Sequence, residues 1–153
     1  SAGYTSNRFY LAITKVTVRP GSTGFGYKAQ FYDNSAVMDE IESFGFKLNL
    51  AGSDRVMTQT IDISALVSGK EYSMLLKNFN IESYGDVAVN AEVFLTRKDG
   101  TEIASSTVSY SMKTMLQAVC DLNLSASQLE ALKSMCAPYK AILESWNIDK
   151  LLK

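Results

Sequence analysis

Aromatic side chains with amides and carboxylates nearby are residues of this chain that could do chemistry, and the chemistry that they could support is sugar recognition. Sugar binding needs exposed aromatic planes that stack on the ring and polar groups that bond to its hydroxyls. The candidates stand near expected strand ends, in turns or in the C-terminal segment: Tyr4, Tyr10, Tyr32, Tyr84 and Trp146, with Asp33, Asn34, Asn80 and Glu82 nearby. The competing interpretation is structural, because a tyrosine beside core phenylalanines is more often a core residue. Trp146, the single tryptophan, is expected chiefly to anchor the C-terminal segment to the sandwich.

Catalytic residues are harder to assemble, because the chain contains no histidine. This excludes Ser-His and Cys-His nucleophile pairs and imidazole zinc ligands. A carboxylate pair for glycoside hydrolysis could be drawn from Asp39, Glu42, Glu71 or Glu92, but no spacing fixes its separation. We therefore expect no catalytic residue, no enzymatic activity and no cofactor.

Metal binding and thiol chemistry are also not favoured. The polar and acidic residues of segment 33–40 offer oxygen ligands of the kind that calcium prefers, without the spacing or the glycine of an EF-hand. A solvated acidic loop is the favoured interpretation. Cys120 and Cys136 lack the paired spacing of a zinc site and are expected to be two small buried side chains rather than a disulfide.

A covalent lysine–asparagine cross-link between strands is a further alternative, since bacterial surface sandwiches sometimes carry one beside a buried carboxylate. Lys28 or Lys47, with Asn49 or Asn90 and Glu92, could supply its groups. Exposed polar residues that alternate along a strand explain the same pattern more simply.

Composition limits the classes of partner. The chain has 153 residues, 15 Lys and Arg against 16 Asp and Glu, a net charge of -1 and a charged fraction of 20%. This length suits one hydrophobic core. The absence of a basic block argues against nucleic acid, and the absence of an apolar run of about 18 residues argues against membrane insertion. Low charge and Ser/Thr-rich strands favour a secreted or cell-surface protein.

A hydrophobic period of two residues extends to about residue 111 and predicts about seven strands of an antiparallel β-sandwich. The expected strands are 9–18, 25–31, 44–50, 56–63, 71–79, 86–97 and 102–111, with a short helical turn at 36–42. Asp99-Gly100 predicts a tight hairpin, because Gly100 tolerates a positive φ. No long helical pattern separates these strands, which disfavours a parallel α/β sheet.

The period changes to a helical one from Ser111. Met112, Met115, Leu116 and Val119 form an apolar stripe, and Ser125 with Gln128 has the spacing of a capping box. Pro138 is expected to kink or restart the second helix. The sequence thus predicts a sandwich over 1–111 and a helical hairpin over 112–153, packed together as one compact unit.

The segment from Leu66 to Met74 resembles the tyrosine corner of fibronectin type III and related immunoglobulin-like sandwiches. In that motif the turn at Gly69 would let the Tyr72 hydroxyl bond to backbone near Leu66. Ser68 stands where the pattern prefers proline. The resemblance implies a fold class and no function.

A wider resemblance covers roughly residues 24–111 and concerns accessory β-sandwich modules in large secreted proteins of anaerobic gut Firmicutes. It is carried by Gly24-Phe25, Asn80-Ile81 with Tyr84, the run from Val89 to Val93, Asp99-Gly100 and Ser109-Tyr110-Ser111. It implies a non-catalytic extracellular accessory or spacer module that orients neighbouring domains of the same polypeptide. Two alternatives remain: a carbohydrate-binding module that attaches a parent enzyme to glycan, and a protein-interaction module that uses the helical stripe from Met112 to Leu143.

Overall fold

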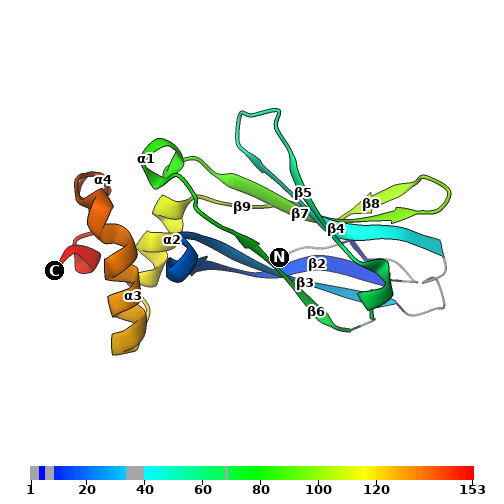
Figure 1. Ribbon diagram of the computed structural model, residues 1–153, viewed down its shortest axis with the longest axis horizontal. Coiled ribbons are helices and arrows are strands. Elements are labelled where there is room, and N and C mark those ends of the chain that lie inside the picture. The colour runs from blue at the N-terminus through cyan, green and yellow to red at the C-terminus, as the bar shows by residue number, and fades with distance from the viewer. Residues whose placement is uncertain (1–3, 6–8, 34–39, 68) are drawn as a thin grey trace. The chain divides into compact units, whose positions relative to one another are not determined.

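The computed structural model describes residues 4–5, 9–33, 40–67 and 69–153, and it is mostly β with antiparallel sheets and C-terminal helices (Figure 1). The chain divides into two compact units. The β unit comprises the described residues of Ser1–Val16, Tyr27–Met74 and Val89–Ser109. The helical unit comprises Thr17–Gly26, Leu75–Ala88 and Tyr110–Lys153. The prediction of a mostly β chain with helices at its C-terminus is confirmed.

The first sheet has the strand order β1-β2-β3-β6. These strands are Tyr4–Thr5, Phe9–Arg19, Gly24–Asp33 and Glu71–Leu76. The alternation expected from the sequence is visible in β3, where Tyr27, Ala29 and Phe31 are buried. Burial of the Tyr27 hydroxyl raises the pKa of that group.

The second sheet has the order β5-β4-β7-β8, and β9 also pairs with β7. Its strands in sequence order are β4 Ile41–Leu50, β5 Met57–Ile61, β7 Val89–Arg97, β8 Glu102–Ala104 and β9 Val108–Tyr110. Gly100 has a φ of +89° in the turn from β7 to β8. The Asp99 carboxylate accepts bonds from the Thr101 hydroxyl at 2.7 Å and the Thr101 N–H at 2.9 Å, and these bonds lower the pKa of Asp99.

Aromatic rings from both sheets meet in the core of the β unit. The rings of Phe31 in β3 and Phe44 in β4 make an edge contact with centroids 6.1 Å apart, and Phe44 lies 5.4 Å from the Tyr72 ring of β6. Each buried ring contributes about 1.5–3 kcal/mol. The core is therefore built by residues that are distant in sequence.

The Tyr72 hydroxyl closes the loop that precedes β6. The Val67 N–H donates to the hydroxyl oxygen at 2.5 Å, and the hydroxyl lies 3.4 Å from the Val67 carbonyl oxygen, one residue beyond Leu66. Gly69 has a φ of +82° in this loop, and its N–H donates to the Phe31 carbonyl at 2.7 Å. The Tyr72 hydroxyl therefore bonds to backbone beside Leu66, as expected from the sequence.

Removal of this hydroxyl by Tyr72→Phe should lower the free energy of unfolding by about 1 kcal/mol, because the Val67 N–H loses its acceptor. Urea unfolding followed by circular dichroism measures the change. The matched control is Tyr84→Phe, at a tyrosine that is 45% exposed, and it should change stability by less than about 0.5 kcal/mol. Equal effects of the two variants would contradict a structural role for the Tyr72 hydroxyl.

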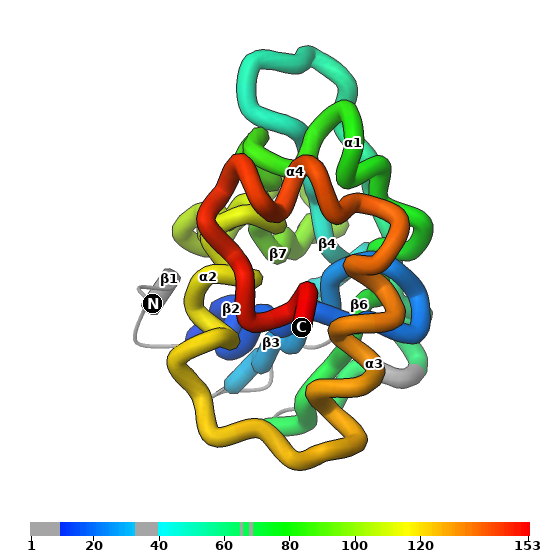
Figure 2. Tube along the Cα trace, turned by 90° about the vertical axis from the view of Figure 1, so that its left-hand side faces the viewer, coloured from blue at the N-terminus to red at the C-terminus, as the bar shows by residue number. Residues whose placement is uncertain are grey.

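The helical unit contains most of the short helices of the chain, together with the end residues of β2, β3, β6 and β9 that fall within its ranges. Its helices are η1 Pro20–Ser22, α1 Ile81–Tyr84, α2 Met112–Val119, α3 Ala126–Cys136, η4 Ala137–Tyr139, α4 Lys140–Ser145 and η5 Lys150–Leu152. Capping boxes at Ser111 and Ser125 begin α2 and α3. Pro138 lies in η4, where the helix restarts. Figure 2 shows the path from α2 through α3 and α4 to η5, which returns to contact α3.

Trp146 is a buried side chain of the helical unit, with 9% of its surface exposed. Its carbonyl accepts a bond from the Gln117 amide of α2 at 3.3 Å. A methyl group on Gly85 would lie 2.9 Å from Trp146 Cζ2 and closer still to Cη2. The Lys113 N–H donates to the Gly85 carbonyl at 2.9 Å, so the segment after α1 is held against both α2 and Trp146.

Gly85→Ala should therefore lower the free energy of unfolding by about 1–3 kcal/mol, because the added methyl overlaps the indole and the nearby backbone. The single tryptophan reports the change, and we expect its fluorescence emission to move to longer wavelength. The control is Gly21→Ala, where nothing lies within 4 Å of the new methyl. An unchanged emission spectrum and stability in Gly85→Ala would contradict the close packing.

Several expected elements have different bounds in the structure. The strand expected at 71–79 ends at Leu76, and the one expected from residue 86 begins at Val89. Between them the Asn80 side chain accepts a bond from the Ser83 N–H at 3.0 Å and begins α1, so local capping overrides the strand pattern.

The expected strand 102–111 is interrupted between β8 and β9. There the Ser105 hydroxyl accepts a bond from the Val93 N–H at 3.0 Å and takes the place of a backbone carbonyl. Of the helical turn expected at 36–42, residues 36–39 lie outside the described residues, and Ile41 with Glu42 belongs to β4.

The strand expected at 56–63 is described as β5, followed by the short turn η3 Ile63–Ala65. Asp62 begins this turn by accepting a bond from the Ser64 N–H at 2.9 Å, which lowers the pKa of Asp62.

In the described part of the chain, every helix lacks the length or apolar character that a membrane span requires.

Candidate groove on the second sheet

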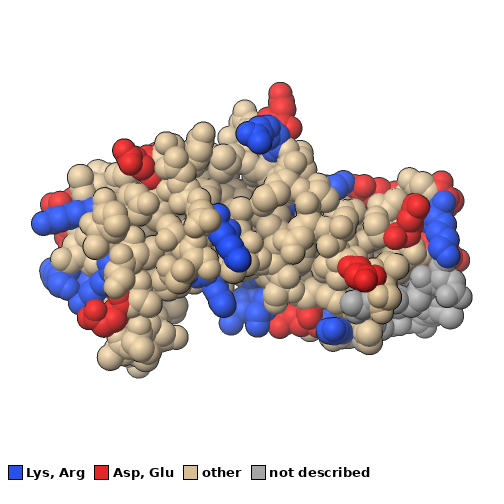
Figure 3. Space-filling view, in the orientation of Figure 1, with Lys and Arg blue, Asp and Glu red and all other residues tan. Residues whose placement is uncertain are grey.

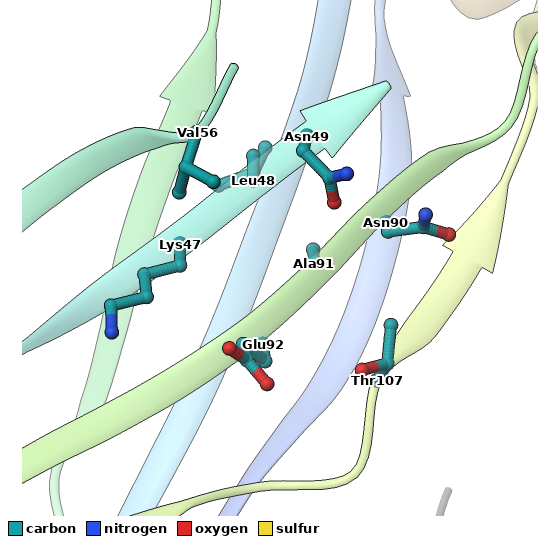
Figure 4. Close-up of a pocket in the computed structure, with 8 residues that line it drawn as sticks. All are labelled: Lys47, Leu48, Asn49, Val56, Asn90, Ala91, Glu92 and Thr107. Carbon is teal, nitrogen blue, oxygen red and sulfur yellow. The ribbon is translucent and has the colours of Figure 1, made fainter. Parts of the chain in front are cut away.

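An open groove of about 540 Å³ lies on the second sheet of the β unit. This volume is in the range of small-molecule sites, about 300–1,000 Å³. The groove is formed by β4, β7 and the segments that precede β5 and β9 (Figure 4). Its lining residues are Lys47, Leu48, Asn49, Val56, Asn90, Ala91, Glu92 and Thr107.

The antiparallel register of β4 and β7 brings the polar side chains together. Lys47 stands directly opposite Glu92, and Asn49 stands directly opposite Asn90. Side chains at alternate positions share a face, so these residues lie on the face opposite Phe44 and Phe46 of β4, which are buried. Two pairs of polar residues thus form a ladder across two adjacent strands.

One end of the groove carries a fixed ammonium group. Lys47 Nζ lies 2.6 Å from Glu102 Oε1 of β8 and 4.6 Å from the centroid of the Phe94 ring. The Glu102 carboxylate balances the positive charge of Lys47, while Glu92 makes no ion pair with the described residues. Because Glu92 adds a negative charge, the groove disfavours anionic ligands.

The two asparagines present complementary atoms. The Asn49 amide donates to the carbonyls of Leu50 at 3.3 Å and Ser53 at 3.2 Å, which leaves its carbonyl oxygen as an acceptor. The Asn90 carbonyl oxygen accepts from the Ser109 hydroxyl at 2.7 Å, which leaves its amide group as a donor. Donors and acceptors therefore alternate, as a ligand with several hydroxyl groups requires.

The groove contains the groups considered for a lysine–asparagine cross-link, but their arrangement does not favour that chemistry. A lysine must be neutral to attack an amide, and the Lys47 ammonium is paired with a carboxylate on a partly exposed side chain. Lys28 belongs to the other sheet, where its Nζ lies 3.3 Å from Glu71 Oε1.

The sugar-stacking residues expected from the sequence do not line this groove, and among the side chains that the structure describes only Tyr10 and Tyr32 come together. The rings of Tyr10 and Tyr32 have centroids 6.1 Å apart and are inclined by 46°, so they do not form one flat platform. Tyr84 is 45% exposed on α1, while Trp146 is buried in the helical unit.

The polar residues expected beside these rings are also dispersed. Asn80 caps α1, and Glu82 is exposed in its first turn. Asn34 lies outside the described residues, and so do the side chains of Tyr4 and Asp33. These residues therefore do not assemble into one site within the described part of the chain.

Sequence reasoning did not assign the groove to sugar binding, although it singled out several of its residues for other reasons. The alternation of Asn90 and Glu92 with buried Val89, Ala91 and Val93 was the available signal. This alternation places Asn90 and Glu92 on the face of β7 opposite these buried residues. The pairing with Lys47 and Asn49, more than 40 positions earlier, depends on the strand register, which no local pattern reveals.

The two cysteines are free thiols in the helical unit. Burial raises the pKa of Cys136 to about 11, and burial also raises the pKa of Cys120. Nucleophilic cysteines need the opposite shift, toward the thiolate. Neither thiol has the electrostatic surroundings of a catalytic nucleophile.

In a Cys120→Ser variant, we expect the remaining Cys136 to react slowly with a disulfide reagent at about pH 8 while the protein is folded, and rapidly in denaturant. A raised native pKa favours the folded state below the unfolded pKa, and this contribution is lost as the pH rises to about 11. The Cys136→Ser variant is the control, since half-buried Cys120 should react faster. Rapid modification of native Cys136 would contradict its burial.

Charged side chains of both signs are interspersed on the face that Figure 3 shows. Within the described residues, no three His, Cys, Asp or Glu side chains lie close enough to hold a metal ion.

The apolar stripe from Met112 to Leu143 was considered as a surface for a protein partner. It includes Leu116, Leu132 and Cys136, all of which are buried.

No protein-family model matches this chain, and no curated protein matches it. Among solved structures it is similar to the crystal structure of a DUF3823 family protein from Bacteroides ovatus, with 10% identity and a TM-score of 0.49. The match covers 69% of this chain and 55% of that chain, so it spans little more than half of the neighbour. The comparisons give no support to the resemblance to Firmicutes modules.

Proposed function

We propose that the protein is a non-catalytic accessory module whose β unit binds a neutral, hydroxyl-rich ligand, such as a segment of a glycan, in the β4–β7 groove. The observation that carries the proposal is the polar ladder of Lys47 opposite Glu92 and Asn49 opposite Asn90. The paired strands hold the backbone positions of these four residues in a fixed register, which lowers the entropic cost of binding.

The ligand class follows from the groups that the groove presents. Asn49 contributes an acceptor, Asn90 contributes donors, and Glu92 contributes a carboxylate that accepts from hydroxyls. The described lining has no aromatic ring, so hydrogen bonds rather than stacking would orient the sugar. We infer a preference for neutral over acidic glycans, because the Glu92 carboxylate would repel a uronate.

We propose that the two sheets form an immunoglobulin-like or fibronectin type III-like sandwich, which the ring contacts of Phe44 and the bond between Tyr72 and Val67 support. The module would belong to a larger secreted or cell-surface protein and would orient its neighbouring domains. The Ser/Thr-rich segment 105–109 and the low charged fraction of 20% support this location.

Affinity electrophoresis through gels that contain soluble neutral polysaccharides tests the groove. The native chain should be retarded, and Asn90→Ala with Glu92→Ala should weaken binding by about 10-fold or more, because two hydrogen-bonding groups are lost. A gel that contains a polyuronate should give less retardation than a neutral one.

The matched control is Glu71→Ala, which removes an exposed carboxylate from β6 in the other sheet and should leave retardation unchanged. Circular dichroism and thermal unfolding establish that all variants are folded. The proposal fails if no neutral polysaccharide retards the native chain, or if the double variant binds as well as the native chain.

A further inference from the structure

Strand β5 is an open edge of the second sheet. Within the described residues it pairs only with β4, and residues 57–60 are exposed on both faces. Met57 is 44% exposed, and neighbouring Val56 is 58% exposed. The edge strands of β-sheets are usually protected by charged residues, proline or a bulge, because their unpaired backbone groups can bind another strand. Residues 57–61 contain no charge and no proline, and their register with β4 is continuous.

The sequence of β5 is nearly the same when read in either direction, as Met-Thr-Gln-Thr-Ile. In an antiparallel pair of two such strands centred on Gln59, Thr58 would face Thr60 of the other copy. Met57 would face Ile61, and Gln59 would face its own counterpart. Apolar pairs and threonine pairs at directly opposed positions stabilise sheets. The strand is therefore complementary to itself.

The register with β4 shows that this pairing also matches the two faces of the sheet. Met57 stands opposite Leu48 and Gln59 opposite Phe46, so both lie on the face that carries the buried side chains of β4. Thr58 stands opposite Lys47 and lies on the groove face. Self-pairing would bury exposed Met57 against half-buried Ile61 on the core side and would leave the threonines on the polar side.

We propose that β5 pairs antiparallel with β5 of a second copy of this chain, about a two-fold axis at Gln59, and so joins the two second sheets into one. Isologous two-fold contacts of this kind close on themselves and do not propagate into fibres. Directly opposed residues of an antiparallel pair share a face, so the grooves of both copies open toward the same side of the joined sheet. The proposal does not depend on the function of the groove.

Single cysteines test the register in a chain that carries Cys120→Ser. Gln59→Cys should give a covalent dimer with oxidised glutathione as oxidant, since each thiol meets its counterpart across the axis at disulfide distance. Met57→Cys is the matched control on the same face of β5, and it should stay monomeric because it faces Ile61. The double variant Met57→Cys, Ile61→Cys should again form covalent dimers.

Sedimentation of the chain without introduced cysteines tests the association itself. The native chain should form dimers as concentration rises, and Gln59→Lys should weaken the dimer by at least about 10-fold, because two like charges would face each other. Ser73→Lys is the control at an exposed position of β6, the edge strand of the other sheet, and should leave the dimer intact. A native chain that remains monomeric throughout, or cross-linking of Met57→Cys as efficient as that of Gln59→Cys, would overturn the proposal.

Discussion

The antiparallel register between β4 and β7 is the constraint on which the rest of the β unit depends. It runs without interruption from Ser43 opposite Thr96 to Leu50 opposite Val89. Because side chains alternate between faces, the same register that buries Phe44 and Phe46 also aligns Lys47 with Glu92. A shift by one residue would turn Lys47 into the core and the phenylalanines toward solvent. The energy of the core therefore fixes the geometry of the groove.

Features with local causes were predictable from the sequence. The two-residue period predicted a mostly β chain, and the capping residues Ser111 and Ser125 predicted where helices begin. The two-residue period gave wrong strand bounds where a side chain forms a hydrogen bond with the backbone. Asn80 accepts from the Ser83 N–H and begins α1, and Ser105 accepts from the Val93 N–H between β8 and β9. Hydrophobic periodicity does not reveal such side-chain bonds.

The candidate site was less predictable, because it depends on contacts across the sheet. The aromatic residues expected to stack on a sugar are divided between the units. Tyr84 and Trp146 lie in the helical unit, and Tyr10 and Tyr32 form a tilted pair in the β unit. The polar ladder could not be predicted, because Asn49 and Asn90 are half-buried strand residues whose pairing depends on the register. Residue type indicated which chemistry was available, but strand register decides where its groups meet.

Strand β4 connects the two proposals, since it carries the groove on one face and holds the open edge of β5 beside it. A groove that relies on hydrogen bonds without a stacking ring gives weak affinity, because each bond replaces one made to water and contributes only about 0.5–1.5 kcal/mol. Repeating glycans offer the same epitope many times along one chain. Two weak sites that open toward the same side of a joined sheet would bind such a chain with an effective concentration set by their fixed spacing, and so gain avidity without any new contact. The unprotected, self-complementary edge of β5 would then serve ligand binding by joining two grooves, whereas in an isolated monomer the same edge would favour aggregation.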